Sequence, residues 1–154
     1  MNIFVLDKDP EIAASMMCDK HVVKMILETA QMLCTVAASK GHDVPYRPTH
    51  KSHPCTVWAG LSRSNWAWLL LHGHALCDEY TRRYGKTHKS LSVIDHCAQL
   101  DLEFDTDALT PFAQAMPPQY RANCPVVAYR NYYHGEKAHF ATWKTSAPDW
   151  WRGR

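Results

Sequence analysis

Four polar side chains on one predicted helix combine the groups that acid–base and amine chemistry need. Lys20, His21, Lys24 and Glu28 lie within one arc of a helix because successive members are one, three and four residues apart. A carboxylate can act as a general acid or base and an amine as a nucleophile. We predict Glu28 as the acid or base and His21 as a proton shuttle, with the amine supplied by Lys24 or Lys20. The alternative is an ordinary solvated helix face.

A second group of candidates lies in the proline-containing loop between residues 42 and 54. Arg47, His50 and His53 stand there beside short hydroxyl side chains. This combination suits phosphate oxygens, because cations and hydroxyls both donate to them. His50, His53 and Cys55 could instead bind a metal, but their spacing matches no common zinc motif. An ordinary structured loop is the third alternative, and we expect neither a metal nor a cofactor.

Basic and aromatic residues in later segments extend this pattern. Asn65 lies at a predicted helix start, where free backbone N–H groups can bind phosphate. Aromatic rings interleaved with cations are typical of sites for flipped or single-stranded bases. The candidates for phosphate or base contact in these segments are Asn65, Lys86, Arg121, Tyr129, Arg130 and Tyr133. Packing in the core is the alternative for the tyrosines.

The size and composition are those of one globular domain. The chain has 154 residues, 46% of them hydrophobic, and a net charge of +2, which does not by itself indicate nucleic-acid binding. The first residues have no signal-peptide pattern, and the run Trp66–Leu71 is too short to span a bilayer. The six cysteines contain no CxxC pair. We therefore expect a reduced, cytoplasmic protein without a membrane partner.

Helix start and stop signals dominate the chain. Asp9 before Pro10 is a strong helix opening, Ser64 can cap a later helix, and Gly41 and Gly85 are typical helix stops. The expected elements are an extended segment at 3–6, helices at about 10–17, 19–39, 65–84, 90–100 and 125–143, and a loop at 101–118. We predict a mostly α fold, a single compact helical domain over residues 1–154 with a short N-terminal extended segment.

Several motifs together resemble the phage-type pyrimidine-dimer DNA glycosylases. The matching pieces are His53-Pro54, the helix end Glu79-Tyr80-Thr81-Arg82-Arg83-Tyr84-Gly85, the turn Met116-Pro117-Pro118-Gln119-Tyr120-Arg121, and the aromatic tail from Trp143 to Trp151. The resemblance implies a small, mostly α protein that acts on DNA and carries a catalytic carboxylate on an early helix. That carboxylate would fall near Val22, so Glu28 or Asp19 would supply it.

The family's nucleophile is an N-terminal α-amine, which forms a Schiff base with the deoxyribose after Met1 is removed. Asn2 is bulky, so we expect Met1 to be retained here and the catalytic N-terminus not to match. This expectation places the amine chemistry on the helix at 19–31.

The function predicted from these residues is a DNA-directed enzyme that acts on a nucleobase or nucleotide, of the glycosylase or base-modifying type. Its partner would be DNA, either single-stranded or with a flipped base, because cations, imidazoles and aromatic rings outnumber carboxylates at the candidate positions. Three alternatives stay open: a metal-dependent nuclease built on the His50/His53 loop, a non-catalytic nucleic-acid-binding protein, and an enzyme on free nucleotides.

Overall fold

Helices make up almost all the regular structure of the protein. The computed structural model describes residues 1–153, and in these residues it contains six α-helices and no β-strand. The α-helices are α1 (Pro10–Met16), α2 (Asp19–Ser39), α3 (Pro54–Leu61), α4 (Arg63–Tyr84), α5 (Leu91–Ala98) and α6 (Pro125–Tyr132). A 3-10 turn, Pro118–Tyr120, precedes α6, and a π-helical turn, Tyr133–Lys137, follows it. The prediction of a mostly α fold is confirmed.

Local capping explains most of these helix ends. The Asp9 side chain accepts hydrogen bonds from the first free N–H groups of α1, and Pro10 occupies the first turn. Gly85 ends α4 in the left-handed conformation, with a φ of 67°. The structure corrects the start of α4, because Ser62 rather than Ser64 caps it. It also adds α3, which begins at the end of the predicted loop and covers residues to which the sequence analysis assigned no element.

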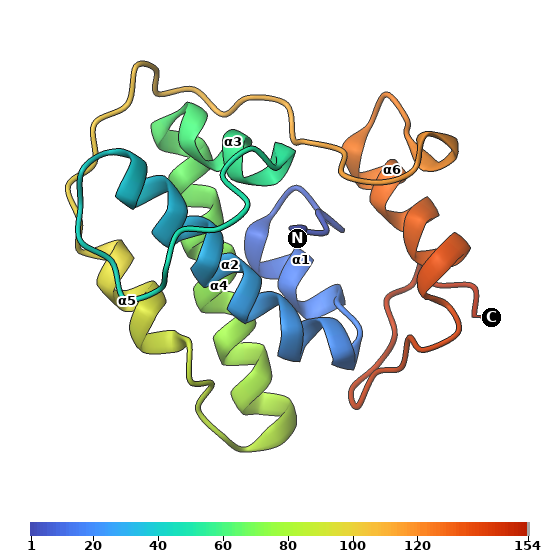
Figure 1. Cartoon of the computed structure of the whole chain (residues 1–154). Helices are drawn as coiled ribbons and strands as arrows, with labels where there is room; N and C mark the ends of the chain where they lie inside the picture. The colour runs from blue at the N-terminus through green and yellow to red at the C-terminus, as the bar shows by residue number, and fades with distance from the viewer. Residues whose placement is uncertain (154) are drawn as a thin grey trace.

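The long helices α2 and α4 pack against each other, and α1, α3 and α5 pack around this pair (Figure 1). The segment Ile3–Leu6 is buried among the core residues, but it is not extended throughout as predicted, because the backbone turns at Phe4. From α5, the segment 99–117 crosses over α3 to reach α6 on the other side of the N-terminus (Figure 1). The end of the chain therefore closes over its beginning.

The orientation of α2 differs from the one expected. His21 and Glu28 of the predicted polar stripe are buried, with 5% and 8% of their surface exposed, whereas Val23 and Leu27 of the predicted apolar side are exposed. The helix is long and apolar enough to span a membrane by length and composition alone, but 67% of its most apolar stretch is buried in the fold. Its buried face thus carries polar groups that need partners inside the protein.

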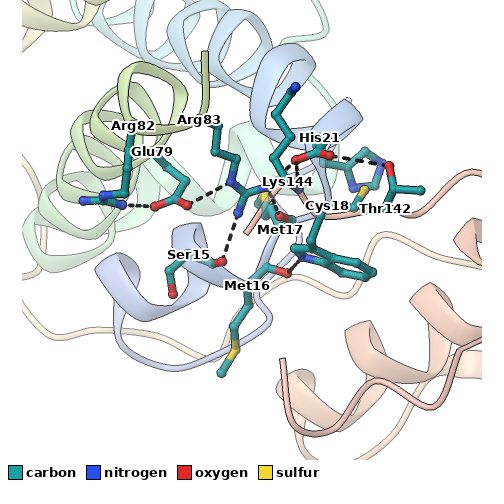
Figure 2. A network of polar contacts seen from close by, with 12 residues as sticks. Ser15, Met16, Met17, Cys18, His21, Glu79, Arg82, Arg83, Thr142 and Lys144 are labelled. Carbon is teal, nitrogen blue, oxygen red and sulfur yellow. Dashed lines mark hydrogen bonds and ion pairs between the residues drawn. The ribbon is translucent and has the colours of Figure 1, made fainter. Parts of the chain in front are cut away.

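A buried ion cluster fixes the junction of α1 and α2 to the end of α4 (Figure 2). The Arg83 guanidinium has no exposed surface; it lies 2.9 Å from Glu79 and 3.0 Å from Asp19. It also donates to the backbone carbonyl groups of Ser15 and Met17. Because charge and hydrogen bonds are both satisfied, this cluster can stay ionised away from water.

Candidate active site

A buried carboxylate meets the N-terminal amine at the surface of α2. Oε1 of Glu28 lies 3.1 Å from the Met1 nitrogen and accepts a hydrogen bond of 3.1 Å from the backbone N–H of Asn2. Its other oxygen lies 3.8 Å from Nζ of Lys24, one turn earlier on the helix. Glu28 thus contacts an amine that could act as a nucleophile. This amine is that of the chain terminus and not that of a lysine on the helix.

The side chain of Asn2 anchors the N-terminal segment in this position. Its Oδ1 accepts hydrogen bonds from the N–H of Ile3 at 2.8 Å and from the Tyr129 hydroxyl at 2.9 Å. Its Nδ2 donates to the carbonyl group of Ala115 at 2.7 Å. These bonds tie the segment to α6 and to the segment before it, so that the position of the amine depends on contacts with distant parts of the chain.

Phe4 turns the N-terminal segment beside the site. Its φ of 60° lies in the left-handed region, which costs a bulky residue about 1–3 kcal/mol. Burial of its ring offsets that cost, since the ring stacks on His21 at 4.2 Å and on Tyr132 at 5.9 Å between centroids. The turn places the aromatic ring under the pocket and directs the chain from the surface into the core.

His21 is held among aromatic rings on the same face of α2 as Glu28. Its Nδ1 lies 2.6 Å from the hydroxyl oxygen of Tyr133, and the edge of Phe140 faces its ring. Burial, and to a smaller extent the positive charges of Lys137 and Lys24, together lower the pKa of His21 to about 3. His21 is therefore neutral at neutral pH, which does not suit the proton shuttle predicted from the sequence.

These groups line one small pocket of about 140 Å³. The N-terminus, Lys24 and Glu28 form one side of it, and Tyr132 and Lys137 from the end of α6 and the following turn form another. Lys137 lies over the ring of Tyr132, with Nζ 4.7 Å from the centroid. The full lining comprises Met1, Asn2, Phe4, His21, Lys24, Met25, Glu28, Tyr132 and Lys137. The pocket thus combines one carboxylate with several cations.

The other predicted amine lies farther from Glu28 along the helix. Lys20 is exposed, and its Nζ lies 5.2 Å from the centroid of the Phe140 ring. Asp19, the second candidate for the catalytic carboxylate, binds Arg83 and the backbone N–H of Lys144, each at 3.0 Å. Its contacts are those of a structural ion cluster, which leaves Glu28 as the carboxylate of the pocket.

The structure corrects the roles predicted for two tyrosines and shows a structural contact for Arg130. Tyr129 and Tyr133 have no exposed surface, so their rings cannot stack on a base; they hold Asn2 and His21 instead. Arg130 donates to the carbonyl group of Leu6 at 3.0 Å and thus also binds the N-terminal segment. Sequence patterns place aromatic residues on a helix face, but they do not show whether that face is covered.

Asn65 is likewise structural. It is fully buried, and its Nδ2 donates to the carbonyl group of Trp58 and to the hydroxyl of Thr110. Its own N–H donates to Ser62, and the N–H groups of the two preceding residues donate to carbonyl groups of the 106–107 segment. The start of α4 therefore offers no free N–H groups of these residues to a phosphate.

Of the loop candidates, His53 lies near the carboxylate and the amine. Burial lowers its pKa most, the positive N-terminus and His50 lower it further, and the charge of Glu28 opposes them. Its Nδ1 accepts the N–H of Cys55 and so caps α3. Within residues 1–153, no three His, Cys, Asp or Glu side chains come together as a metal site, so the His50, His53 and Cys55 alternative finds no donor set there.

Arg47, His50, Lys86 and Arg121 are exposed at the surface. His50 has a φ of 49°, so the loop makes a sharp turn there. Contact of these four residues with phosphate stays a prediction.

Residues 1–92 match the pyrimidine dimer DNA glycosylase family. The chain belongs to this family. The matched part extends from the N-terminus to the start of α5 and includes Met1, His21 and Glu28, whereas Tyr132 and Lys137 follow it. Membership gives the protein a glycosylase-type function on DNA and confirms the resemblance inferred from the motifs. No curated protein and no solved structure matches the chain.

Sequence reasoning missed two parts of this site. The α-amine of Met1 was set aside because Met1 is followed by a bulky residue, yet the run of apolar residues at 3–6 is a signal that the terminus enters the fold. Lys137 falls on one predicted helix face with Tyr129 and Tyr133, but the sequence does not place it at the pocket, because its approach depends on how α6 packs over the N-terminal segment.

Proposed function

We propose that the protein is a DNA glycosylase for pyrimidine dimers, with the N-terminal α-amine as the nucleophile and Glu28 as the general acid and base. The distance of 3.1 Å between the Met1 nitrogen and Glu28 Oε1 supports this proposal most directly. Membership of the pyrimidine dimer glycosylase family supports the substrate class. The amine role predicted for Lys24 or Lys20 passes to the chain terminus.

The reaction follows from the two groups in contact. The amine nitrogen forms a bond to C1′ of the target deoxyribose while the bond from C1′ to the base breaks. The base nitrogen keeps the bonding electrons and takes a proton from solvent, and the base stays joined to the neighbouring pyrimidine through the dimer. Glu28 accepts the proton that the amine loses and returns it as the sugar ring opens to an imine. Water then hydrolyses the imine, which frees the amine and leaves an abasic site.

An N-terminal amine suits this step better than the lysines of α2. An α-amine is a weaker base than a lysine side chain, so a larger fraction of it carries a free electron pair at neutral pH. Lys24 has 71% of its side chain exposed and lies 3.8 Å from Glu28. Its position at the rim of the pocket suits a contact with a DNA phosphate.

The exposed cations are the proposed phosphate contacts. Lys24 and Lys137 flank the pocket, and Arg47, His50, Lys86 and Arg121 extend the basic surface away from it. Each phosphate contact that is lost on substitution should weaken binding and make it less dependent on salt. A protein that acts on DNA in this way is proposed to work inside the cell.

Borohydride reduction on DNA that contains an abasic site tests the amine. We expect a covalent adduct, and mass spectrometry of its peptides should locate it on the N-terminal α-amine. An extension of Gly-Ser before Met1 should abolish the adduct, whereas the Lys24→Ala and Lys20→Ala variants should retain it. An adduct on either lysine, or no adduct at all, would overturn the proposal. If Met1 is removed, Asn2 should carry the adduct, because its nitrogen also lies 3.1 Å from Oε1.

Substitution of the carboxylate tests its role in proton transfer. Glu28→Gln keeps the shape of the side chain but cannot accept a proton, so the rate of glycosidic-bond cleavage in dimer-containing DNA should fall by roughly 10²–10⁴-fold. DNA affinity should change little. Glu11→Gln, at an exposed carboxylate on α1, is the matched control and should keep the full rate. If the protein only binds DNA, or acts on free nucleotides, neither the unmodified protein nor either variant should cleave the glycosidic bond in dimer-containing DNA.

A further inference from the structure

The pair formed by Tyr133 and His21 has no assigned part in the proposed reaction. Tyr133 begins the turn after α6, whereas His21 lies in the first turns of α2. The tyrosine has no exposed surface, and its hydroxyl oxygen lies 2.6 Å from Nδ1 of the imidazole. A buried hydroxyl group costs free energy unless it forms hydrogen bonds inside the protein.

The distance indicates which atom carries the proton. A distance of 2.6 Å is shorter than the usual range of N–H···O bonds, which favours the hydroxyl over the ring nitrogen as the donor. Burial raises the pKa of Tyr133 well above that of a free phenol, so its hydroxyl keeps its proton. The hydroxyl oxygen also accepts the N–H of Cys18 at 3.3 Å, which leaves the hydroxyl proton available to Nδ1.

The sulfur of Cys18 is the competing acceptor for that proton. It lies 3.6 Å from the hydroxyl oxygen, and a thiol sulfur is a weak acceptor compared with an imidazole nitrogen. The hydroxyl is therefore expected to donate to His21. A neutral imidazole that accepts at Nδ1 carries its own proton at Nε2.

The surroundings leave Nε2 free for the pocket. The ring is held from two sides, by the stacked Phe4 and by the edge of Phe140. Within residues 1–153, the ring of His21 makes one hydrogen bond, and that bond is at Nδ1. His21 also lines the pocket that contains Glu28 and the N-terminus. A neutral imidazole held by such a bond can act as a hydrogen-bond donor without changing its charge during a reaction.

We propose that Tyr133 is a positioning residue that fixes His21 as the neutral Nε2–H tautomer, so that His21 donates a hydrogen bond to a sugar or phosphate oxygen of the target nucleotide. This role rests on the proposed glycosylase function and replaces the proton shuttle. His21 binds the substrate through Nε2, and Tyr133 acts through His21 alone.

The tautomer is measured directly by the nitrogen-15 chemical shifts of the His21 ring in the full-length protein without DNA. We expect protonation at Nε2 in the unmodified protein and a mixture of tautomers in Tyr133→Phe. Cys18→Ala removes the competing acceptor of the same hydroxyl and should leave the tautomer unchanged. Protonation at Nδ1 in the unmodified protein would overturn the proposal, even if Tyr133→Phe fails to fold.

Kinetics on dimer-containing DNA separate positioning from folding. Tyr133→Phe should lower kcat roughly 3- to 10-fold with an unchanged KM, because one hydrogen bond is lost from a preorganised group. His21→Gln places an amide N–H near the position of Nε2 and should keep more activity than His21→Asn, whose amide reaches only the position of Nδ1. Equal loss in the two His21 variants would contradict the donor role.

The two proposals fail separately. If the N-terminal adduct is absent but the tautomer is as expected, the amine mechanism is wrong and the Tyr133–His21 pair stands. If the adduct forms and Nδ1 carries the proton, only the positioning role is wrong.

Discussion

Two buried histidines should make the folded state lose stability as the pH falls below 6.5. His72 on α4 has no exposed surface; its Nδ1 lies 2.9 Å from the carbonyl oxygen of Pro10, and its Nε2 has no partner within residues 1–153. Burial lowers the pKa of His72 to about 4, although nearby backbone groups oppose the shift. The pKa of His21 falls to about 3 for the same main reason.

The direction follows from proton binding in the two states. In the unfolded chain both imidazoles take up a proton near pH 6.5, whereas in the folded protein they stay neutral down to about pH 4 and 3. Between these values the unfolded state binds more protons, so the free energy of unfolding falls as the pH falls. Well below pH 6.5 each group contributes about 1.4 kcal/mol per pH unit, and at pH 6.5 itself about half of that, because the unfolded imidazole is then half protonated. Together they should remove about 3 kcal/mol between pH 6.5 and 5.0, against about 5–15 kcal/mol for a whole domain.

Urea unfolding followed by circular dichroism, at half-unit steps from pH 5.0 to 7.0, measures this slope. His72→Asn keeps a donor near the position of Nδ1 but does not titrate, so its slope should be smaller by about 1.4 kcal/mol per pH unit. The exposed His139→Asn is the control and should keep the full slope. A core substitution also lowers stability by an amount that does not depend on pH. This amount does not affect the slope of the unfolding free energy against pH, so the slopes of the variants can be compared directly. An unchanged slope in His72→Asn would refute the reasoning.

Three further substitutions test the fold that positions the site. Arg83→Leu removes the cation shared by Asp19 and Glu79, of which Glu79 keeps Arg82, and should cost about 3–5 kcal/mol in urea unfolding, while an equal stability would show that the ion cluster is dispensable. Asn65→Ala leaves the carbonyl group of Trp58 and the N–H of Thr110 without their hydrogen-bond partner and should cost about 1–3 kcal/mol by the same assay. Gly135→Ala places a methyl group on the ring of Tyr120 and should lower stability by about 1–3 kcal/mol; full stability would mean that the ring moves freely.

The helices of this protein could be predicted because their signals are local. Asp9 and Pro10 open α1, Gly85 ends α4, and the amphipathic run from Asp19 to Ser39 gives α2 with both ends correct. The family resemblance could be inferred as well, since it depends on short motifs and their order along the chain. Capping and helical periodicity act within a few residues and therefore leave a readable pattern.

The candidate site depends on which faces of these helices are covered. Lys20, His21, Lys24 and Glu28 follow one another on α2, but burial separates them: the imidazole and the carboxylate lie in the fold, and the lysines lie at its surface. The sequence pattern is the same whether a polar stripe faces water or a neighbouring segment. Packing of α6 and of the N-terminal segment therefore decided which of these groups could interact.

The sequence by itself determined most of the helices, the family and the presence of one carboxylate beside several cations on α2, but neither α3 nor the end of α6 at Tyr132. Tertiary structure decided that the amine beside Glu28 is the chain terminus and that Tyr129 and Tyr133 support Asn2 and His21 rather than contact a base. The physical reason is distance along the chain: these contacts join residues more than a hundred positions apart or link the first residue to a helix. Such contacts form only when the whole chain packs around one core.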